Sequence, residues 1–228
     1  MDITGANNQI RTGANLRIEG EIVGDGNIVE IGEASLDSTL TLSVRGDGNR
    51  IRIGKLVQLK GLRIRVGTHV PADATRLTIA EGFSAEWNTQ FLLPNSGNNL
   101  TIGENCMFSN SITIRCGESP HLLFDLQTGQ YLDSGSRTVI GDHVWIGEGA
   151  YLTKRTIIGR ESIIGANSVV TGQFDEEHVI IAGNPAKVVR KGVRWIRNPS
   201  LLTPGTPEHD SYHAHMRAHA KRDAADSA

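Results

Sequence analysis

His121 is the side chain in this sequence that is best suited to acid–base chemistry. An imidazole can take up a proton near neutral pH, and a carboxylate that accepts a hydrogen bond from the ring can hold its tautomer. Glu118 lies three residues before His121 and Asp125 four residues after it, so either carboxylate could do this. The arrangement indicates a general base, and the alternative that stays open is a solvated loop histidine.

A tryptophan, a thiol and a basic run offer further chemistry. Trp145 could stack on a sugar ring or an extended ligand, or could cover a subunit contact. Cys116 begins the same segment as His121 and could act as a covalent nucleophile, although only Arg115 beside it would lower the thiol pKa. Five basic residues follow the repeats, and they could bind phosphate groups or simply form a solvated face. They are Lys187, Arg190, Lys191, Arg194 and Arg197.

The elements that would position these residues follow a repeat of six. Apolar residues keep this phase at Ile140, Ile146, Leu152, Ile158, Ile164 and Val170, and glycine often follows them. A helix repeats every 3.6 residues and a strand every two, whereas a period of six indicates a chain that turns a corner every few residues. The pattern predicts an all-β parallel β-helix, and the alternative is a sandwich of short strands.

The same repeat continues upstream in a looser form. The anchors Ile31, Ile53, Ile79, Ile102 and Ile140 are spaced 22, 26, 23 and 38 residues apart. If one coil takes three six-residue faces, the last interval holds a large excursion, at about residues 115–137. We therefore expect His121 to lie on a long loop outside the coils, where solenoids usually carry function.

The repeats set the domain organisation. We expect a β-helix domain over residues 1–197 and a C-terminal tail over residues 198–228 that is helical or disordered. Histidines of the tail such as His209 and His213 have helical spacing, but no cysteine or inward-facing partner accompanies them. We expect no metal site.

Composition limits the classes of function. The 228-residue chain has a formal net charge of −2, which disfavours general nucleic-acid binding. Two cysteines make no disulfide framework and favour a reducing compartment. The polar first 20 residues do not read as a signal peptide, and no apolar run is long enough to span a membrane. The expected location is the cytoplasm.

Three segments carry a resemblance to a known family. The stretches IGDHVWIGEGA (140–150), IIGANSVVT (163–171) and IAGNPAKVVR (181–190) resemble the hexapeptide-repeat acyltransferases. CMFS (106–109), HLLFDLQTG (121–129) and Trp145 most resemble capsular polysaccharide O-acetyltransferases, including those that act on polysialic acid. Ser119-Pro120 adds one residue before His121 relative to that subgroup.

The resemblance implies a left-handed parallel β-helix that acts as a homotrimer with active sites between subunits. General β-crossover geometry would instead favour the right hand. The family pattern places His121 as the base and Trp145 at the acyl-transfer site, with Glu118 as a candidate partner of His121. It implies acetyl-CoA as co-substrate, held by Trp145, Gly147, Ala166, Thr171, Lys187 and Arg190.

These residues predict transfer of an acetyl group from acetyl-CoA directly to a hydroxyl of a sugar, in a capsular or exopolysaccharide. An anionic acceptor would suit the basic residues Lys55, Lys60, Arg63 and Arg65. The alternatives are a small sugar, a nucleotide-sugar or an amine as acceptor. A zinc-dependent β-helix of the carbonic anhydrase kind and a non-catalytic β-helix also stay open.

Overall fold

The chain folds as a parallel β-solenoid, which confirms the predicted β-helix. The computed structural model describes residues 1–133 and 137–226. The six anchors of the regular repeat, from Ile140 to Val170, are each at most 1% exposed. The last five each end a two-residue strand whose first residue is only half-buried, so every sixth side chain points to the axis.

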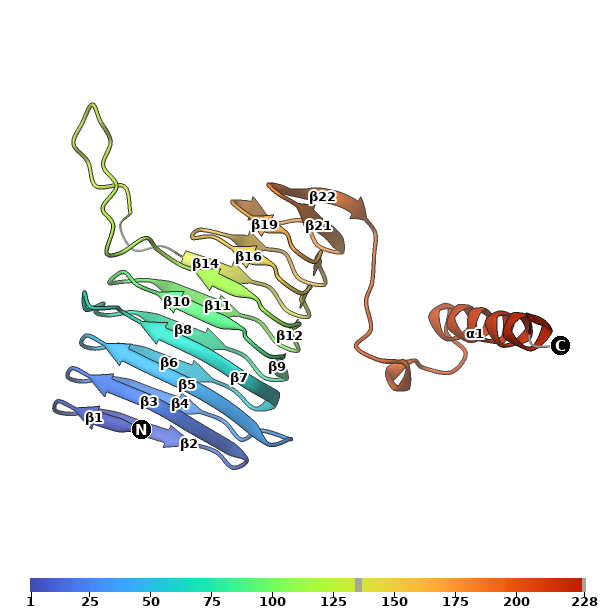
Figure 1. The fold of residues 1–228 in the computed structure, drawn as a ribbon, viewed down its shortest axis with the longest axis horizontal. Coiled ribbons are helices and arrows are strands. Elements are labelled where there is room, and N and C mark those ends of the chain that lie inside the picture. The colour runs from blue at the N-terminus through green and yellow to red at the C-terminus, as the bar shows by residue number, and fades with distance from the viewer. Residues whose placement is uncertain (134–136, 227–228) are drawn as a thin grey trace. The chain divides into compact units, whose positions relative to one another are not determined.

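Each coil contributes to three faces, which the chain visits in order. The second face is the simplest, with all its strands parallel, and consists in stacking order of β2 (Gln9–Thr12), β4 (Ile28–Ile31), β6 (Arg50–Ile53), β8 (Arg76–Ile79), β11 (Asn99–Ile102), β14 (Arg137–Ile140), β17 (Ile157–Ile158) and β20 (Gln173–Phe174). These eight strands of the described residues mark eight coils. Figure 1 shows the stack rising from β1 and β2 to β19 and β21.

The other two faces join through one long strand. The first face consists of β1 (Asp2–Thr4), β3 (Leu16–Val23), β5 (Ser38–Arg45), β7 (Leu56–Val66), β10 (Gln90–Leu93), β13 (Thr113–Arg115), β16 (Tyr151–Leu152) and β19 (Val169–Val170). The third face consists of β9 (Phe83–Ala85), β12 (Met107–Phe108), β15 (Trp145–Ile146), β18 (Ile163–Ile164) and β21 (Val179–Gly183), and β22 (Ala186–Lys191) pairs antiparallel with β21. The beginning of β7 pairs with β9 and its end with β10.

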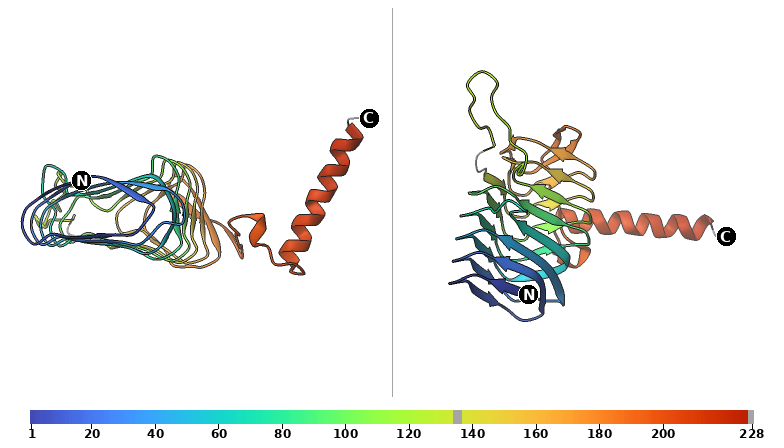
Figure 2. Two further views of the ribbon diagram at one scale, coloured as in Figure 1. Left: turned by 90° about the horizontal axis from the view of Figure 1, so that it is seen from below. Right: turned by 60° about the vertical axis from the view of Figure 1, so that its left-hand side comes forward.

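The first coils are therefore flatter than the later ones. β3, β5 and β7 have 8, 8 and 11 residues and run without a corner where later coils turn. Viewed nearly along the stack, in the left panel of Figure 2, the coils overlay as an elongated outline. This wider section accounts for the looser repeat at the start of the sequence.

The core is a single column with one polar strip. Three rings, Phe83, Phe91 and Phe108, pack with centroids 4.9 to 6.3 Å apart in the middle coils. At the corner before the second face, Asn49 Nδ2 donates to Asn27 Oδ1 at 3.0 Å, and both side chains are buried. The repeated Gly-Asn motif of the sequence thus forms a ladder in which the buried side-chain amides hydrogen-bond to one another.

The rest of the chain forms a second compact unit. The two units divide after Arg194, three residues before the boundary expected from the sequence. The second unit contains a short 3₁₀ turn (Pro199–Leu201) and helix α1 (Pro207–Asp226). None of the helices in the described part of the chain is long and apolar enough to cross a membrane.

We expect Ile164→Ala to lower the free energy of unfolding by about 2–5 kcal/mol, because it removes buried apolar contacts and leaves a cavity between coils. Ile164 is 0% exposed, whereas Ile163 in the same strand faces outward and is half-buried. Ile163→Ala is the matched control and should cost about 1 kcal/mol or less. Urea denaturation at fixed protein concentration measures both. Equal losses would contradict the inward column.

Candidate functional site

The large excursion leaves the solenoid at the corner between the first and second faces. It follows β13 and ends at β14, and its residues 134–136 lie outside the described part of the chain. It projects beyond the coils as a hairpin in Figure 1. Leu132 N donates to Leu123 O at 2.8 Å, and the Phe124 and Tyr131 rings pack with centroids 5.6 Å apart.

The tip of the hairpin is organised by Asp125. The Asp125 carboxylate accepts hydrogen bonds from the main-chain N–H groups of Gln127 and Thr128 and from the Thr128 hydroxyl. The hydrogen bonds from Thr128 lower the pKa of the Asp125 carboxyl. This carboxylate is therefore occupied in a local turn, which leaves it poorly placed to orient His121.

His121 lies at the start of the outgoing half of the excursion. Its main-chain N–H donates to Glu118 O at 3.0 Å, across the cis Ser119–Pro120 peptide bond, and closes a tight turn. The side chain is exposed. An imidazole at the edge of a projecting loop can meet a ligand bound outside the coils.

The Glu118 carboxylate pairs with cations. It lies 3.2 Å from Arg115 Nε and 3.7 Å from Lys154 Nζ. Glu118 was expected as the partner of the imidazole, but the contact that it makes with His121 is through its main-chain carbonyl. Glu118 thus positions the turn that carries His121.

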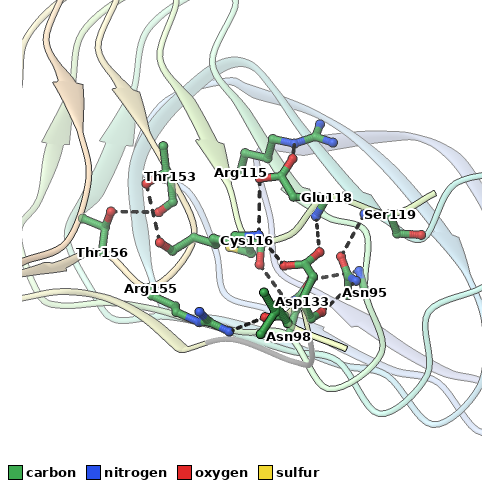
Figure 3. A network of polar contacts seen from close by, with 12 residues as sticks. Asn95, Asn98, Arg115, Cys116, Glu118, Ser119, Asp133, Thr153, Arg155 and Thr156 are labelled. Atoms are coloured by element: carbon green, nitrogen blue, oxygen red, sulfur yellow. Dashed lines mark hydrogen bonds and ion pairs between the residues drawn. The ribbon is translucent and has the colours of Figure 1, made fainter. Parts of the chain in front are cut away.

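A buried ion pair holds the base of the excursion on the solenoid. Asp133 is 1% exposed, and its carboxylate lies 2.6 Å from Lys154 Nζ and accepts the Glu118 N–H at 2.7 Å. Lys154 comes from the next coil, so the pair ties both ends of the loop to the stack. Figure 3 shows Asp133 among these groups.

Amide and guanidinium groups complete the network at the base. Asn95 Nδ2 donates to Tyr131 Oη and Asp133 O, and Asn95 Oδ1 accepts the Ser119 N–H at 3.2 Å. Arg155 donates to Leu132 O at 2.8 Å. Both ends of the excursion are therefore fixed by groups from neighbouring coils, as Figure 3 shows for Asn95 and Arg155.

The sequence interpretation missed Asp133, Lys154 and Asn95. Asp133 belongs to no motif, and its burial arises only from a tertiary contact. One signal was present, since Lys154-Arg155 places two long basic side chains together at a corner, whereas the equivalent pairs Arg160-Glu161 and Ala166-Asn167 do not. Long cations at a crowded corner indicate a nearby anionic or carbonyl partner.

Trp145 lies on the third face, away from the corner of the excursion. It is half-buried in β15, pairs with β12 and β18, and donates from Nε1 to Ser109 Oγ at 3.2 Å. Within one chain, therefore, Trp145 and the His121 loop belong to different sides of the coil. The structure does not bring these two residues together in a single protomer.

Gly147 and Ala166 are stacked at the corner after the third face. A Cβ on Gly147 would lie 2.8 Å from both Ile164 O and Ala166 N, so only glycine allows this close approach of the coils. Ala166 is exposed. Thr171 follows β19 and so lies at the corner of the excursion instead. Lys187 and Arg190 are exposed on β22.

The Cys116 thiol is a poor nucleophile where it stands. The side chain is 0% exposed, and burial raises the pKa of the thiol to about 12. At neutral pH the thiol is therefore protonated.

In the described residues no group of three or more His, Cys, Asp or Glu side chains could hold a metal ion.

Comparison with known proteins confirms the resemblance seen in the sequence. Residues 137–172 match the family described as bacterial transferase hexapeptide (six repeats). A polysialic acid O-acetyltransferase of Escherichia coli O1:K1 is 31% identical over 164 residues, which are 72% of this chain and 48% of that protein. The chain thus spans about half the length of this relative. A polysialic acid O-acetyltransferase of Neisseria meningitidis is 26% identical over 76% of this chain and 87% of its own length.

Two solved structures have the same fold. The polysialic acid O-acetyltransferase OatWY superposes with a TM-score of 0.71 at 22% identity, over 92% of this chain and 95% of its own. The polysialic acid-specific acetyltransferase NeuO gives a TM-score of 0.74 at 23% identity, over 94% of this chain and 97% of its own.

We expect Asp133→Asn to loosen the excursion, because the variant leaves Lys154 without its buried partner. Breaking a buried pair costs about 3 kcal/mol or more, which corresponds to hydrogen exchange about a hundredfold faster for the Glu118 N–H. Glu30→Gln, which removes an exposed partner of Arg52, is the control and should leave exchange in the excursion unchanged. Unaltered exchange in Asp133→Asn would show that the ion pair does not hold the loop.

Proposed function

We propose that this hexapeptide-repeat solenoid, similar in sequence to polysialic acid O-acetyltransferases, transfers an acetyl group from acetyl-CoA to a sugar hydroxyl of a polysaccharide. The observation that carries the proposal is a projecting, firmly anchored loop that presents an exposed histidine, in a chain with such relatives. Acetyl transfer needs a base, a path for the attacking oxygen and donors for the developing oxyanion.

We infer that the complete site forms between subunits of a homotrimer. His121 projects from the corner before the second face, and Trp145 lies on the third face of the coil. A loop that reaches outward from one protomer can meet the third face of a neighbour, and a closed ring of three would repeat this contact. The separation of the two residues within one chain supports this arrangement.

The donor would lie along the outside of the coils. Gly147, Gly165, Ala166 and Ala182 place small residues directly after the strands of the third face. This leaves room for the long pantetheine arm of coenzyme A, whose amides can bond main-chain groups. Trp145 offers an apolar face beside it. The exposed Lys187 and Arg190 could pair with the phosphates at the other end of the donor.

In the proposed reaction His121 takes the proton of the sugar hydroxyl as the oxygen attacks the thioester carbonyl. The tetrahedral intermediate collapses with cleavage of the carbon–sulfur bond. The imidazolium then returns its proton to the departing thiolate of coenzyme A. The acetyl group therefore passes directly to the sugar, and the buried Cys116 takes no part.

His121→Ala tests the proposal. We expect the rate of acetyl transfer to a polysaccharide acceptor to fall about 10²–10⁴-fold, because the base is lost. The KM for acetyl-CoA should change by no more than about twofold, since the donor contacts lie elsewhere. The measurement is a transfer assay with radiolabelled acetyl-CoA across a panel of polysaccharides and free sugars.

His143→Asn is the matched control for that variant. His143 Nδ1 lies 2.8 Å from Glu161 Oε2 at a coil corner, and its φ of 51° is one that asparagine tolerates. This variant should keep the native rate. Native activity in His121→Ala would exclude His121 as the base.

Cys116→Ala should retain the native transfer rate within about twofold, because a thiol with a pKa near 12 supplies almost no thiolate. Mixing the native protein with acetyl-CoA alone should give no acetyl-enzyme by mass spectrometry. A covalent acetyl adduct on Cys116, together with loss of transfer in the variant, would establish the covalent route instead.

A further inference from the structure

A column of arginines runs along the second face, at its edge beside the excursion. Arg50, Arg76 and Arg137 are the first residues of β6, β8 and β14, and all three are exposed. Arg50 pairs in register with Arg76, which pairs with Asn99, which pairs with Arg137. The column therefore spans four consecutive coils, with Asn99 in the third position, and ends where the excursion rejoins the stack.

These three guanidinium groups have no carboxylate partner within the described residues. The neighbouring column of the same face differs, because Arg11 and Arg52 lie 3.7 and 2.9 Å from the Glu30 carboxylate. Like charges directly opposite each other on adjacent strands are destabilising. The Arg50–Arg76 pair thus carries a cost that its neighbours avoid.

The acidic side chains at the adjacent corner accept hydrogen bonds from the main chain. Asp47 Oδ1 accepts the Asp25 N–H and Asp73 Oδ1 accepts the Asp47 N–H, each at 2.8 Å. These carboxylates hold neighbouring coils together at the corner before the second face. They reduce the local positive charge, but they do not pair with the guanidinium groups of the column.

The other side of the same corner is also basic. Arg45 and Arg65 line an open cleft of about 360 Å³ with Ser43, Thr68 and His69. Glu21, also in this cleft, lies 3.1 Å from Arg45 Nη2, whereas Arg65 has no such partner in the described part of the chain. Cations thus flank the corner on both sides below the excursion.

We propose that Arg50, Arg76 and Arg137 bind the carboxylates of an anionic polysaccharide acceptor and lead the polymer to the His121 loop. This inference rests on the proposed acetyl transfer and adds to it the residues along which an anionic acceptor would bind. A guanidinium fork matches the two oxygens of a carboxylate. Bound carboxylates would also remove the repulsion between the stacked arginines.

The length of the column favours a polymer over a single sugar. Neighbouring parallel strands are about 4.8 Å apart, so Arg50 and Arg137 are separated by about 14 Å along the stack. A row of this length needs several charged groups on one ligand. A nucleic acid would suit a broader basic surface, whereas this single row lies beside the Asp25, Asp47 and Asp73 carboxylates.

The test compares an Arg50→Gln and Arg76→Gln double variant with Arg52→Gln, whose arginine lies on the same face but is paired with Glu30. Binding of two carboxylated polymers, polysialic acid and polygalacturonate, is measured by affinity electrophoresis, with neutral dextran for comparison. We expect the native protein to bind at least one of them, and the double variant to bind it about tenfold more weakly. Arg52→Gln should bind like the native protein, and added salt should weaken native binding more than that of the double variant.

Several results would overturn the inference. They are absence of native binding to both polymers, equal loss in Arg52→Gln, and competition by duplex DNA as strong as by the polymers. A changed oligomeric state of the double variant in size-exclusion chromatography would instead assign the column to a subunit contact. If the native protein binds the polymer through this column but transfers no acetyl group, the proposed activity fails while the binding site stands.

Discussion

The structure depends on the hydrogen bonding of each coil to the next, in register, around a column of aliphatic side chains. Every anchor of the regular repeat is buried beside its equivalents one coil away, as the pairings Ile140 to Ile158 and Ile146 to Ile164 show. Because main-chain bonds and core contacts both act between neighbouring coils, stability is built locally. Outward side chains contribute little to it, so the three faces and their corners can carry chemistry.

This constraint explains how much the sequence could predict. A six-residue period leaves a visible pattern, so the coils, the inward anchors and the position of the excursion could be inferred from residues alone. The flattened first coils, in which β7 runs past a corner without a break, could not be inferred in this way. The local pattern there fits either a corner or a continuous strand.

The candidate site was predictable in its parts but not in its connections. The loop position and chemistry of His121 indicated a base, and nearby carboxylates were natural candidates to orient it. The structure instead uses Glu118 with Arg115 and Lys154, and Asp133 with Lys154, to hold the loop. The two pairings with Lys154 join residues from different coils, and sequence spacing within one loop gives no information about them. The separation of Trp145 from the loop likewise depends on which face each strand takes.

The antiparallel strand β22 has a consequence for solubility. A stack of parallel strands ends in unpaired N–H and C=O groups, which offer a template on which a further chain could add and start a fibre. After the last coil the chain reverses at Gly183 and lays β22 against β21, so that edge is covered from within. The new edge carries the exposed Lys187 and Arg190, and like charges on it would repel a second copy. The hairpin therefore covers the last edge of the third face, whereas β19 and β20 are the last strands of the other two faces.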